Sequence, residues 1–503
     1  MLTRDQFQSI YDQGPDATFA LVLSLQSASV AHQKEIRSLQ EKIVDLFQQL
    51  VAQGEQIAAL SQRVKELEDR LGKDSHNSSK PPSSDGFNKK PRSQRTRTGR
   101  PSGGQKGHPG HTLEFDDQPN EIVMHAPSWC QGCGVSLEDA PEAGFERRQV
   151  FDLPPISLFV TEHRALSRTC PACGKENRAS FPEGVEQPVQ YGPRVHALVT
   201  YLSSFQLLPY GRTVTLLSDL FNIHLSEGSI SNFTQRAASH LVDVEKAIYQ
   251  ALCHADTVHF DETGVRIAGK LNWLHVSSTP EQTFYAHHPK RGGSALDDIG
   301  ILPQFGGRAI HDEWSAYHRY GCRHGLCNAH HLRELTAVEE QLSQPWAKDM
   351  RELLVEIKRA VDSARDRGIR QIHPLALCRY EARYRKILSA GYAANPPPEA
   401  TGRRGRPKQG PARNLLLRLD QRQAEVLAFM YDFGVPFDNN LAERDLRMMK
   451  VKQKVSGCFR SEEGGKAFCR IRGYISTMRK QGHNVLSALQ SVFENRPLVP
   501  RTA

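Results

Sequence analysis

The stretch TVHFDETGVRI, residues 257–267, decides the predicted fold, because it opens a series of β-like segments after a helical region at 193–252. Its β-branched and aromatic residues predict a strand. Two more such runs follow, NWLHVSST at 272–279 and QTFYAHHP at 282–289, each separated from the last by turn residues. An amphipathic segment at 295–304 then predicts a helix, and GRAIHD at 307–312 predicts a fourth strand.

Three acidic residues stand where this order of elements would bring them together. Asp261 lies at the end of the first predicted strand, Asp312 at the end of the fourth, and Glu443 opens a later helix in FDNNLAER, residues 437–444. Carboxylates gathered at one sheet edge supply the oxygen ligands that Mg²⁺ or Mn²⁺ prefers, and two such ions can promote displacement at a phosphodiester. We therefore predict these three residues as catalytic ligands of two metal ions. Five nearby acids are alternatives: Asp256, Glu262, Glu313, Asp438 and Asp445.

Three strands, a helix and a fourth strand are also the opening order of a ribonuclease-H-like α/β domain. Among the alternative acids, Asp438 suits a helix cap. Glu262 and Glu313 are expected to point away from the neighbouring strand's edge, because side chains alternate along a strand.

The predicted helix after residue 440 has a basic character. Arg447 and Lys450 follow Glu443 by four and seven residues, so they share its face and would hold a DNA backbone beside the metals. A solvated basic face is the alternative. The candidate DNA-binding residues on this helix are Arg444, Arg447, Lys450, Lys452 and Lys454.

Four of the ten cysteines form two Cys-x-x-Cys pairs. Cys130 and Cys133 precede Cys170 and Cys173, and a glycine follows each second cysteine, as the tight turn of a knuckle requires. We predict a zinc ribbon with one structural Zn²⁺ on these thiolates. β-strands are expected between the pairs, at 148–159 and 159–166.

A second group, CNAHH at 327–331, follows a predicted fifth strand. His330 is interpreted as supporting the DNA or the active site. Two alternatives stay open here: a packing role, and a metal site that Cys327 and His330 form with Cys322 and His324.

The N-terminal region predicts a coiled coil. From residue 36 apolar side chains recur at steps of three and four over five heptads, interrupted by the polar Gln53, and Gln, Glu, Lys and Arg fill many of the remaining positions. A self-associating coiled coil therefore competes with a helix packed on the protein's own body. The apolar positions are Ile36, Leu39, Ile43, Leu46, Leu50, Ile57, Leu60, Val64, Leu67 and Leu71.

The net charge of +9 over 503 residues indicates a polyanionic partner and is unevenly distributed. Residues 73–112 carry +7, 402–413 carry +5 and 444–460 carry +5, which leaves −8 for the rest of the chain. No apolar run approaches the ~18 residues of a membrane span, and Asp5, Asp12 and Asp16 precede the best N-terminal candidate, at 19–25. We expect an intracellular protein without a membrane segment.

We thus predict a multidomain α+β protein. Thr213 to Leu241 resembles a helix-turn-helix, with plain scaffold as its alternative and a small core of Leu216, Leu217, Leu220, Ile223, Ile230 and Phe233. The expected domains are a helical coiled coil (1–72), a flexible basic linker (73–115), the zinc ribbon (116–186), a helix-turn-helix-like DNA-binding segment (187–252), the first part of the ribonuclease-H-like catalytic domain (253–330), a helical insertion with a basic loop (331–432) and the second catalytic part (433–503).

Several motifs together resemble the DDE transposases of the insertion sequence 66 family. They are FDETGVRIAGKLNWLHV, HDEWSAYHRY, CNAHHLREL and VPFDNNLAERDLRMMKVKQKVSGCFRS, with NSSKPPSSDG, GRPSGGQKGHPGHTLE and the cysteine pairs before them. The resemblance runs from about residue 70 to 480. It implies a ribonuclease-H-like catalytic domain, and the family's acidic triad falls on Asp261, Asp312 and Glu443. Val265 and Asn328 stand where the family carries aromatic residues.

The expected function is therefore DNA transposition: cleavage at the transposon ends, then transfer of the 3′ ends to target DNA. The expected partners are the terminal repeats, target DNA, further copies of the chain through the coiled coil, and accessory transposition proteins, in the nucleoid of a bacterial cytoplasm. Two rival functions are a non-catalytic zinc-ribbon and coiled-coil regulator that binds DNA, and a metal-dependent nuclease that cuts without joining.

Overall fold

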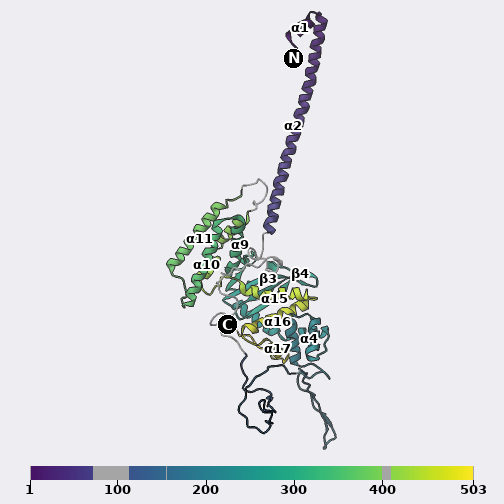
Figure 1. Ribbon diagram of the computed structural model, residues 1–503, viewed down its shortest axis with the longest axis vertical. Coiled ribbons are helices and arrows are strands. Elements are labelled where there is room, and N and C mark those ends of the chain that lie inside the picture. Colours follow the sequence, from purple (N-terminus) through teal and green to yellow (C-terminus); the bar gives the residue numbers. More distant parts are fainter. Residues whose placement is uncertain (1, 72–112, 155, 399–408, 502–503) are drawn as a thin grey trace. The chain divides into compact units, whose positions relative to one another are not determined.

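The computed structural model describes residues 2–71, 113–154, 156–398 and 409–501. These fall into two units, which we describe separately: 2–71 with 336–344, and the remaining described residues (Figure 1). Most of the predicted linker, residues 73–112, lies outside the described residues. So do residues 402–408 of the second basic tract.

The N-terminal region is helical, as predicted. The short helix α1 spans Arg4–Tyr11, and Thr3 caps it in a reciprocal capping box with Gln6. The long helix α2 spans Pro15–Leu71 and begins well before the first predicted heptad position; proline suits its first turn because an amide hydrogen there has no helical partner. The described apolar side chains of the heptad pattern are exposed, Ile43, Leu46 and Leu50 each by more than 60%. Pairing of this helix with a second copy stays a prediction.

The cysteine-containing segment has little regular structure. The short strands β1 (Ser167–Thr169) and β2 (Glu176–Arg178) pair antiparallel around the second cysteine pair. The strands expected at 148–159 and 159–166 are wrong for the residues that are described there. Their alternating apolar side chains, Val150, Phe159 and Val160 among them, are exposed, and no neighbouring strand satisfies the backbone.

Helices then precede the main sheet. They are α3 (Pro193–Thr200), the π-helical turn η2 (Tyr201–Phe205), α4 (Tyr210–Phe221), α5 (Glu227–His240) and α6 (Val242–His254). The helix-turn-helix-like pair is α4 and α5: Asn222 ends α4 in a left-handed conformation and Ser226 caps α5. Leu217, Ile223 and Ile230 form its core with α3, as expected, but Leu220 is exposed and was wrongly included.

The five-stranded sheet follows the predicted order of strands. β3 (Thr257–Ile267), β4 (Lys270–Ser278) and β5 (Thr283–His288) form an antiparallel meander. After the short helices α7 (Gly293–Ile299) and α8 (Ile301–Gln304), β6 (Arg308–His311) returns parallel to β3, and β7 (Arg323–Leu326) pairs parallel to β6 beyond the 3₁₀ turn η3 (Tyr317–Arg319). The spatial order is β5-β4-β3-β6-β7.

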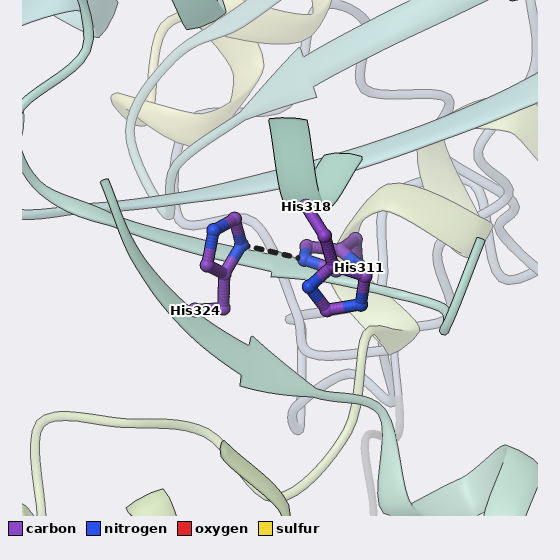
Figure 2. Close-up of side chains that lie close together, drawn as sticks. All are labelled: His311, His318 and His324. Atoms are coloured by element: carbon purple, nitrogen blue, oxygen red, sulfur yellow. Dashed lines mark hydrogen bonds between the residues drawn. The ribbon is translucent and has the colours of Figure 1, made fainter. Parts of the chain in front are cut away.

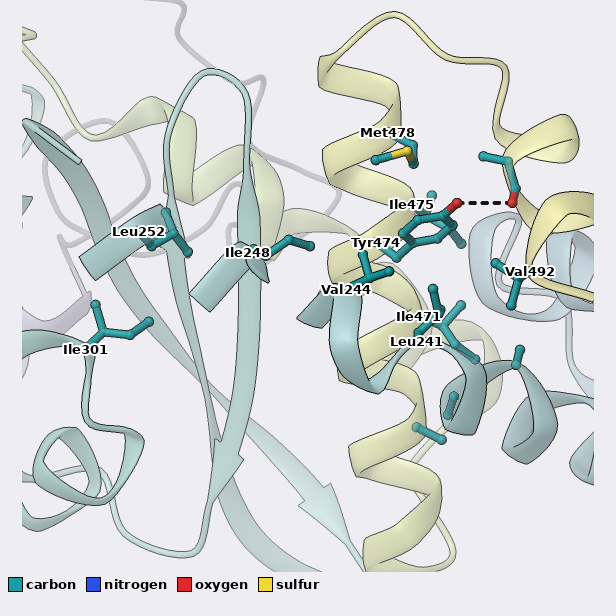
Figure 3. Close-up of a cluster of buried hydrophobic side chains, with 14 of the residues drawn as sticks. Leu241, Val244, Ile248, Leu252, Ile301, Ile471, Tyr474, Ile475, Met478 and Val492 are labelled. Atoms are coloured by element: carbon teal, nitrogen blue, oxygen red, sulfur yellow. Dashed lines mark hydrogen bonds between the residues drawn. The ribbon is translucent and has the colours of Figure 1, made fainter. Parts of the chain in front are cut away.

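The C-terminal helices pack against this sheet and against other helices (Figure 1). Helix α15 (Asn440–Ser456) covers β3 and β4, α16 (Glu462–Lys480) packs on β5, and α17 (Val485–Phe493) packs on α3 and α16. The largest apolar core lies among α6, α8, α16 and α17, where Tyr474 donates a hydrogen bond to the carbonyl of Ala488 (Figure 3). This core joins the helices before the sheet to those at the end of the chain.

The predicted insertion is helical. Its elements are α9 (Asn328–Leu342), α10 (Pro345–Asp366), α11 (Pro374–Ala394), α12 (Pro411–Gln421), α13 (Gln423–Val426) and α14 (Ala428–Tyr431). The first helix starts at Asn328, three residues before the predicted boundary. Among the described residues, no helix is both long and apolar enough to cross a membrane.

Candidate active site

Asp261 and Asp312 extend from the same end of one parallel pair of strands. The pairing of β3 with β6 ends at His259 and Ile310, and each aspartate lies two residues beyond its paired neighbour. We predicted Asp261 at the end of its strand. This position is wrong, because β3 continues to Ile267 in its pairing with β4. Asp312 therefore directly follows the end of β6, whereas Asp261 lies within β3, beyond the part that pairs with β6.

Glu443 reaches the same region from the first turn of α15. The start of this helix is tied to β3 by Asn439, which is almost fully buried. Its side-chain amide donates to the carbonyl of Phe260 at 2.8 Å, and its side-chain oxygen lies 2.8 Å from Nδ1 of His259. Asn439 therefore connects the helix of Glu443 to the residue immediately before Asp261. The sequence pattern alone assigns no role to this asparagine, which lies within FDNNLAER.

Asp261 lies near enough to Asp312 and Glu443 for their negative charges to act on it. Burial raises the pKa of Asp261 well above its usual range, and the negative charges of Glu262, Asp312 and Glu443 raise it further. A backbone N–H donated by Glu262 opposes that shift. The negative charges of Asp312 and Glu443 therefore act on Asp261, and their joint role as metal ligands stays a prediction.

Glu262 is a fourth acid at this site, and its predicted orientation was wrong. Its side chain is 1% exposed, and burial and Asp312 raise its pKa. Arg291 forms an ion pair with one of its oxygens at 2.6 Å, and the hydroxyl of Tyr317 donates to the other at 2.5 Å. The β3 backbone holds it beside Asp261, and its charge is balanced by an arginine that strand alternation alone does not reveal.

The donor set fits a hard divalent cation. All three predicted ligands offer oxygen, which Mg²⁺ and Mn²⁺ prefer. Oε1 of Glu443 is buried without a hydrogen-bond partner, and nearby negative charge destabilises ionised Asp261. The described structure does not, however, bring an oxygen of each of the three residues within 4.8 Å of the others.

The remaining acids have other roles in the structure. Glu313 pairs with His331 and Arg418. Asp438 accepts the N–H of Asn440 and so helps begin α15, as its position suggested. Asp445 is buried in a polar network, where it pairs with Lys480 at 2.8 Å and accepts a hydrogen bond from Ser278 at 2.6 Å. The structure assigns no such side-chain contact to Asp256.

His330 lies beside Glu443, with Nδ1 3.9 Å from Oε1. Cys327 completes a group in which one ligand atom of each residue lies within 4.8 Å of the others. Burial and the nearby Glu443 raise the pKa of the Cys327 thiol to about 12, and its sulfur accepts the N–H of Asn439 at 3.1 Å. The alternative metal site with Cys322 and His324 is wrong, because His324 groups instead with His311 and His318.

The basic residues of α15 do not all face the same way. Arg444, Arg447, Lys450 and Lys454 are exposed. Lys452 turns inward, its ammonium 5.1 Å from the ring centre of Phe459 and 5.2 Å from that of Phe468, and burial lowers its pKa. Lys452, predicted as a DNA-binding residue, therefore does not lie on the exposed face of the helix.

The two cysteine pairs form turns of the same kind. In each, the backbone carbonyl of the first cysteine accepts the N–H of the glycine that follows the second cysteine, at 2.9 Å. These glycines, Gly134 and Gly174, both adopt positive φ, which suits the tight turn. Hydrogen bonds from neighbouring backbone amides lower the pKa of Cys130 and Cys170. The structure does not bring the four thiols into one group of ligands.

Comparison with known protein families agrees with this organisation. Residues 188–467 match a family described as "Transposase IS66 family", and residues 127–174 match the zinc-finger binding domain of transposase IS66. Residues 26–114 match a family of unknown function (DUF6444). No curated protein matches the chain.

The chain has a zinc-finger segment followed by a mixed helix-and-sheet transposase domain. This combination indicates a protein that binds DNA and processes nucleic acid. The match at 188–467 covers more than half of the chain and contains every predicted catalytic residue. The chain belongs to the transposase IS66 family. The zinc-finger match contains both cysteine pairs and supports structural zinc there.

Proposed function

We propose that this chain cleaves the ends of its transposon by metal-dependent hydrolysis and transfers the freed 3′ ends to target DNA. The main support is that Asp312, which follows β6, and Glu443, in the first turn of α15, both lie near enough to Asp261 on β3 to raise its pKa. Membership of a transposase family supports the same reaction class.

The strand order supports a ribonuclease-H-like catalytic domain. In sequence order the strands take the spatial arrangement 3-2-1-4-5, with the first three antiparallel and the last two parallel to the first. The helical insertion separates the strands from α15, so the third carboxylate comes from beyond it. We infer that α9 to α14 interrupt this domain between its second and third catalytic residues.

The chain's own residues would hold and tune the metal ligands. Mg²⁺ or Mn²⁺ at Asp261, Asp312 and Glu443 would activate an attacking oxygen and stabilise the leaving oxygen at a phosphodiester. Arg333 and His330 lie 3.9 Å from the two oxygens of Glu443 and would restrict its orientation. Arg291 compensates the charge of Glu262, so the acid next to Asp261 does not need a metal of its own.

DNA would lie along the exposed basic face of α15. Arg444, Arg447 and Lys450 follow Glu443 on this helix, and cations there would neutralise phosphates next to the scissile bond. The helix pair α4 and α5 and a zinc ribbon on Cys130, Cys133, Cys170 and Cys173 would recognise the terminal repeats. Pairing of α2 between copies would hold two ends in one complex, with accessory proteins, on nucleoid DNA.

The test uses the full chain with Mg²⁺, labelled transposon-end DNA and a target plasmid. Joined product is the expected result. Cleavage without joining would favour the nuclease, and binding alone would favour a non-catalytic regulator.

Asp261→Asn should bind the end DNA and fail to cut it, because the amide removes one negative ligand from the site. Asp438→Asn is the matched control: the new side chain can still accept the N–H of Asn440, so cutting should continue. If Asp261→Asn cuts at the wild-type rate, the assignment of the triad is wrong.

A further inference from the structure

Three histidines form a cluster next to Asp312 that the proposed reaction does not use. His311 ends β6, His318 lies in η3 and His324 lies in β7 (Figure 2). One ring nitrogen of each lies within 4.8 Å of the others. The distances between ring centres are 5.1 to 5.2 Å. The three rings therefore form one cluster, and its member His311 directly precedes Asp312.

Hydrogen bonds to the backbone define which nitrogens carry protons. Nδ1 of His311 contacts the carbonyl of Asp312, and Nε2 of His324 lies 3.2 Å from the carbonyl of Tyr320. Because a carbonyl only accepts, each of these nitrogens must be the N–H of its ring. Nε2 of His311 and Nδ1 of His324 are then left with lone pairs in the neutral rings.

These two nitrogens face each other at 2.9 Å. Two neutral rings with lone pairs at that distance repel one another, so the arrangement requires a proton or a metal ion between them. Neutral imidazole is the form that binds metals.

His318 supplies an independent observation. Both of its ring nitrogens are buried, and neither has a hydrogen-bond partner among the described residues. A buried polar group without a partner is costly unless something unseen satisfies it. The charged groups that face the cluster are Arg422, Glu425 and Glu313, and Arg422 pairs with Glu425 at 3.2 Å.

We propose that His311 Nε2, His324 Nδ1 and a ring nitrogen of His318 bind one zinc ion. Three imidazoles are a common zinc ligand set, and water completes the tetrahedron. Zn–N bonds of ~2.0–2.1 Å place two such nitrogens about 3.3 Å apart, close to the separation of the facing pair. Carbonyls that accept from the far side of two rings are the outer partners such ligands use.

This zinc would be separate from the catalytic ions and from the cysteine pairs. It would connect β6, η3 and β7, and so fix both ends of the loop that carries Asp312. Its role is to position Asp312, and His311 takes part through its contact with the carbonyl of that residue.

The test measures zinc in the full-length chain purified from zinc-supplied cells. His318→Ala should contain one zinc fewer per chain than the wild type. His287→Ala is the matched control, because both ring nitrogens of His287 are also buried without partners, on β5 and outside the cluster. Its zinc content should equal that of the wild type. Equal zinc in all three proteins would overturn the proposal.

A second variant guards against loss of zinc through unfolding. His318→Cys replaces one zinc ligand by another, so it should retain the full zinc content. After replacement of zinc by cobalt, this variant should gain a sulfur-to-cobalt charge-transfer band relative to the wild type. A spectrum without that additional band would contradict ligation at position 318.

Discussion

Among single residues, Asn439 does most to place Glu443 relative to Asp261. It makes contacts through three groups: its side-chain oxygen with His259, its side-chain amide with the carbonyl of Phe260, and its backbone N–H with the sulfur of Cys327. His259 and Phe260 belong to β3, and Cys327 directly follows β7. The neighbouring Asn440 is exposed and has none of these side-chain contacts.

Asn439→Ala should lower the free energy of unfolding by about 2 kcal/mol, because it leaves a buried carbonyl and a buried imidazole without partners. It should also slow cleavage, since the first turn of α15 loses its attachment to β3. Thermal or urea unfolding and the end-cleavage assay measure the two effects. Asn440→Ala should change stability by less than about 0.5 kcal/mol, and equal effects of both substitutions would contradict this role.

At the scale of elements, α15 serves two purposes on different faces. Leu446 and Met449 pack on the sheet, and Asp445 connects the helix to β4 through Ser278 and to α16 through Lys480. The opposite side presents Arg444, Arg447, Lys450 and Lys454 to solvent. The anchored face keeps Glu443 in place while the exposed face remains free for a polyanion.

Replacing both Arg447 and Lys450 by Ala should weaken binding to end DNA and reduce its salt dependence. The logarithm of the binding constant falls as the logarithm of the salt concentration rises. Each lost phosphate contact makes this slope less steep by about 0.9. Lys452→Met is the matched control, because this lysine lies over Phe459 and Phe468 and not on the exposed face. Binding to end DNA, measured over a series of salt concentrations, compares the double variant with Lys452→Met. An unchanged slope in the double variant would contradict the assignment of α15 to the DNA interface.

At the scale of the whole molecule, α2 leaves its apolar heptad positions without cover. Leu39, Leu46 and Leu60 are each more than half exposed. A helix of 57 residues with such a narrow apolar seam gains stability by pairing with another helix. We infer that the partner is a second copy of this chain.

Leu46→Asp should therefore reduce the mass of the assembly in solution, because it places a charge in the seam. Gln48→Asp adds the same charge two residues away, off the seam, and should leave the mass unchanged. Light scattering on the eluting protein measures both. A wild-type chain that is already a monomer, or a Leu46→Asp assembly of unchanged mass, would contradict pairing through α2.

Local patterns were sufficient for much of the fold. Alternating apolar residues, turn residues and heptad spacing predicted β3 to β7 and the helical character of residues 36–71, because these signals are contained within each element. The same reasoning failed at 148–166, where an alternating pattern has no partner strand. A strand depends on its neighbour for hydrogen bonds, and its own residues do not reveal whether that neighbour exists.

The sequence by itself determined the acidic triad as a prediction, since the order of strands places Asp261 and Asp312 at one edge and the family motif contains Glu443. Only the tertiary structure decided that Glu262 joins them, that Lys452 turns inward, and that His324 meets His311 and His318. Each of these depends on contacts between residues distant in the chain: Arg291 with Glu262, Phe468 with Lys452, and β6 with β7. Burial and partner geometry, which arise from such contacts, determine the charge and orientation of a side chain, and these are what decide its chemistry.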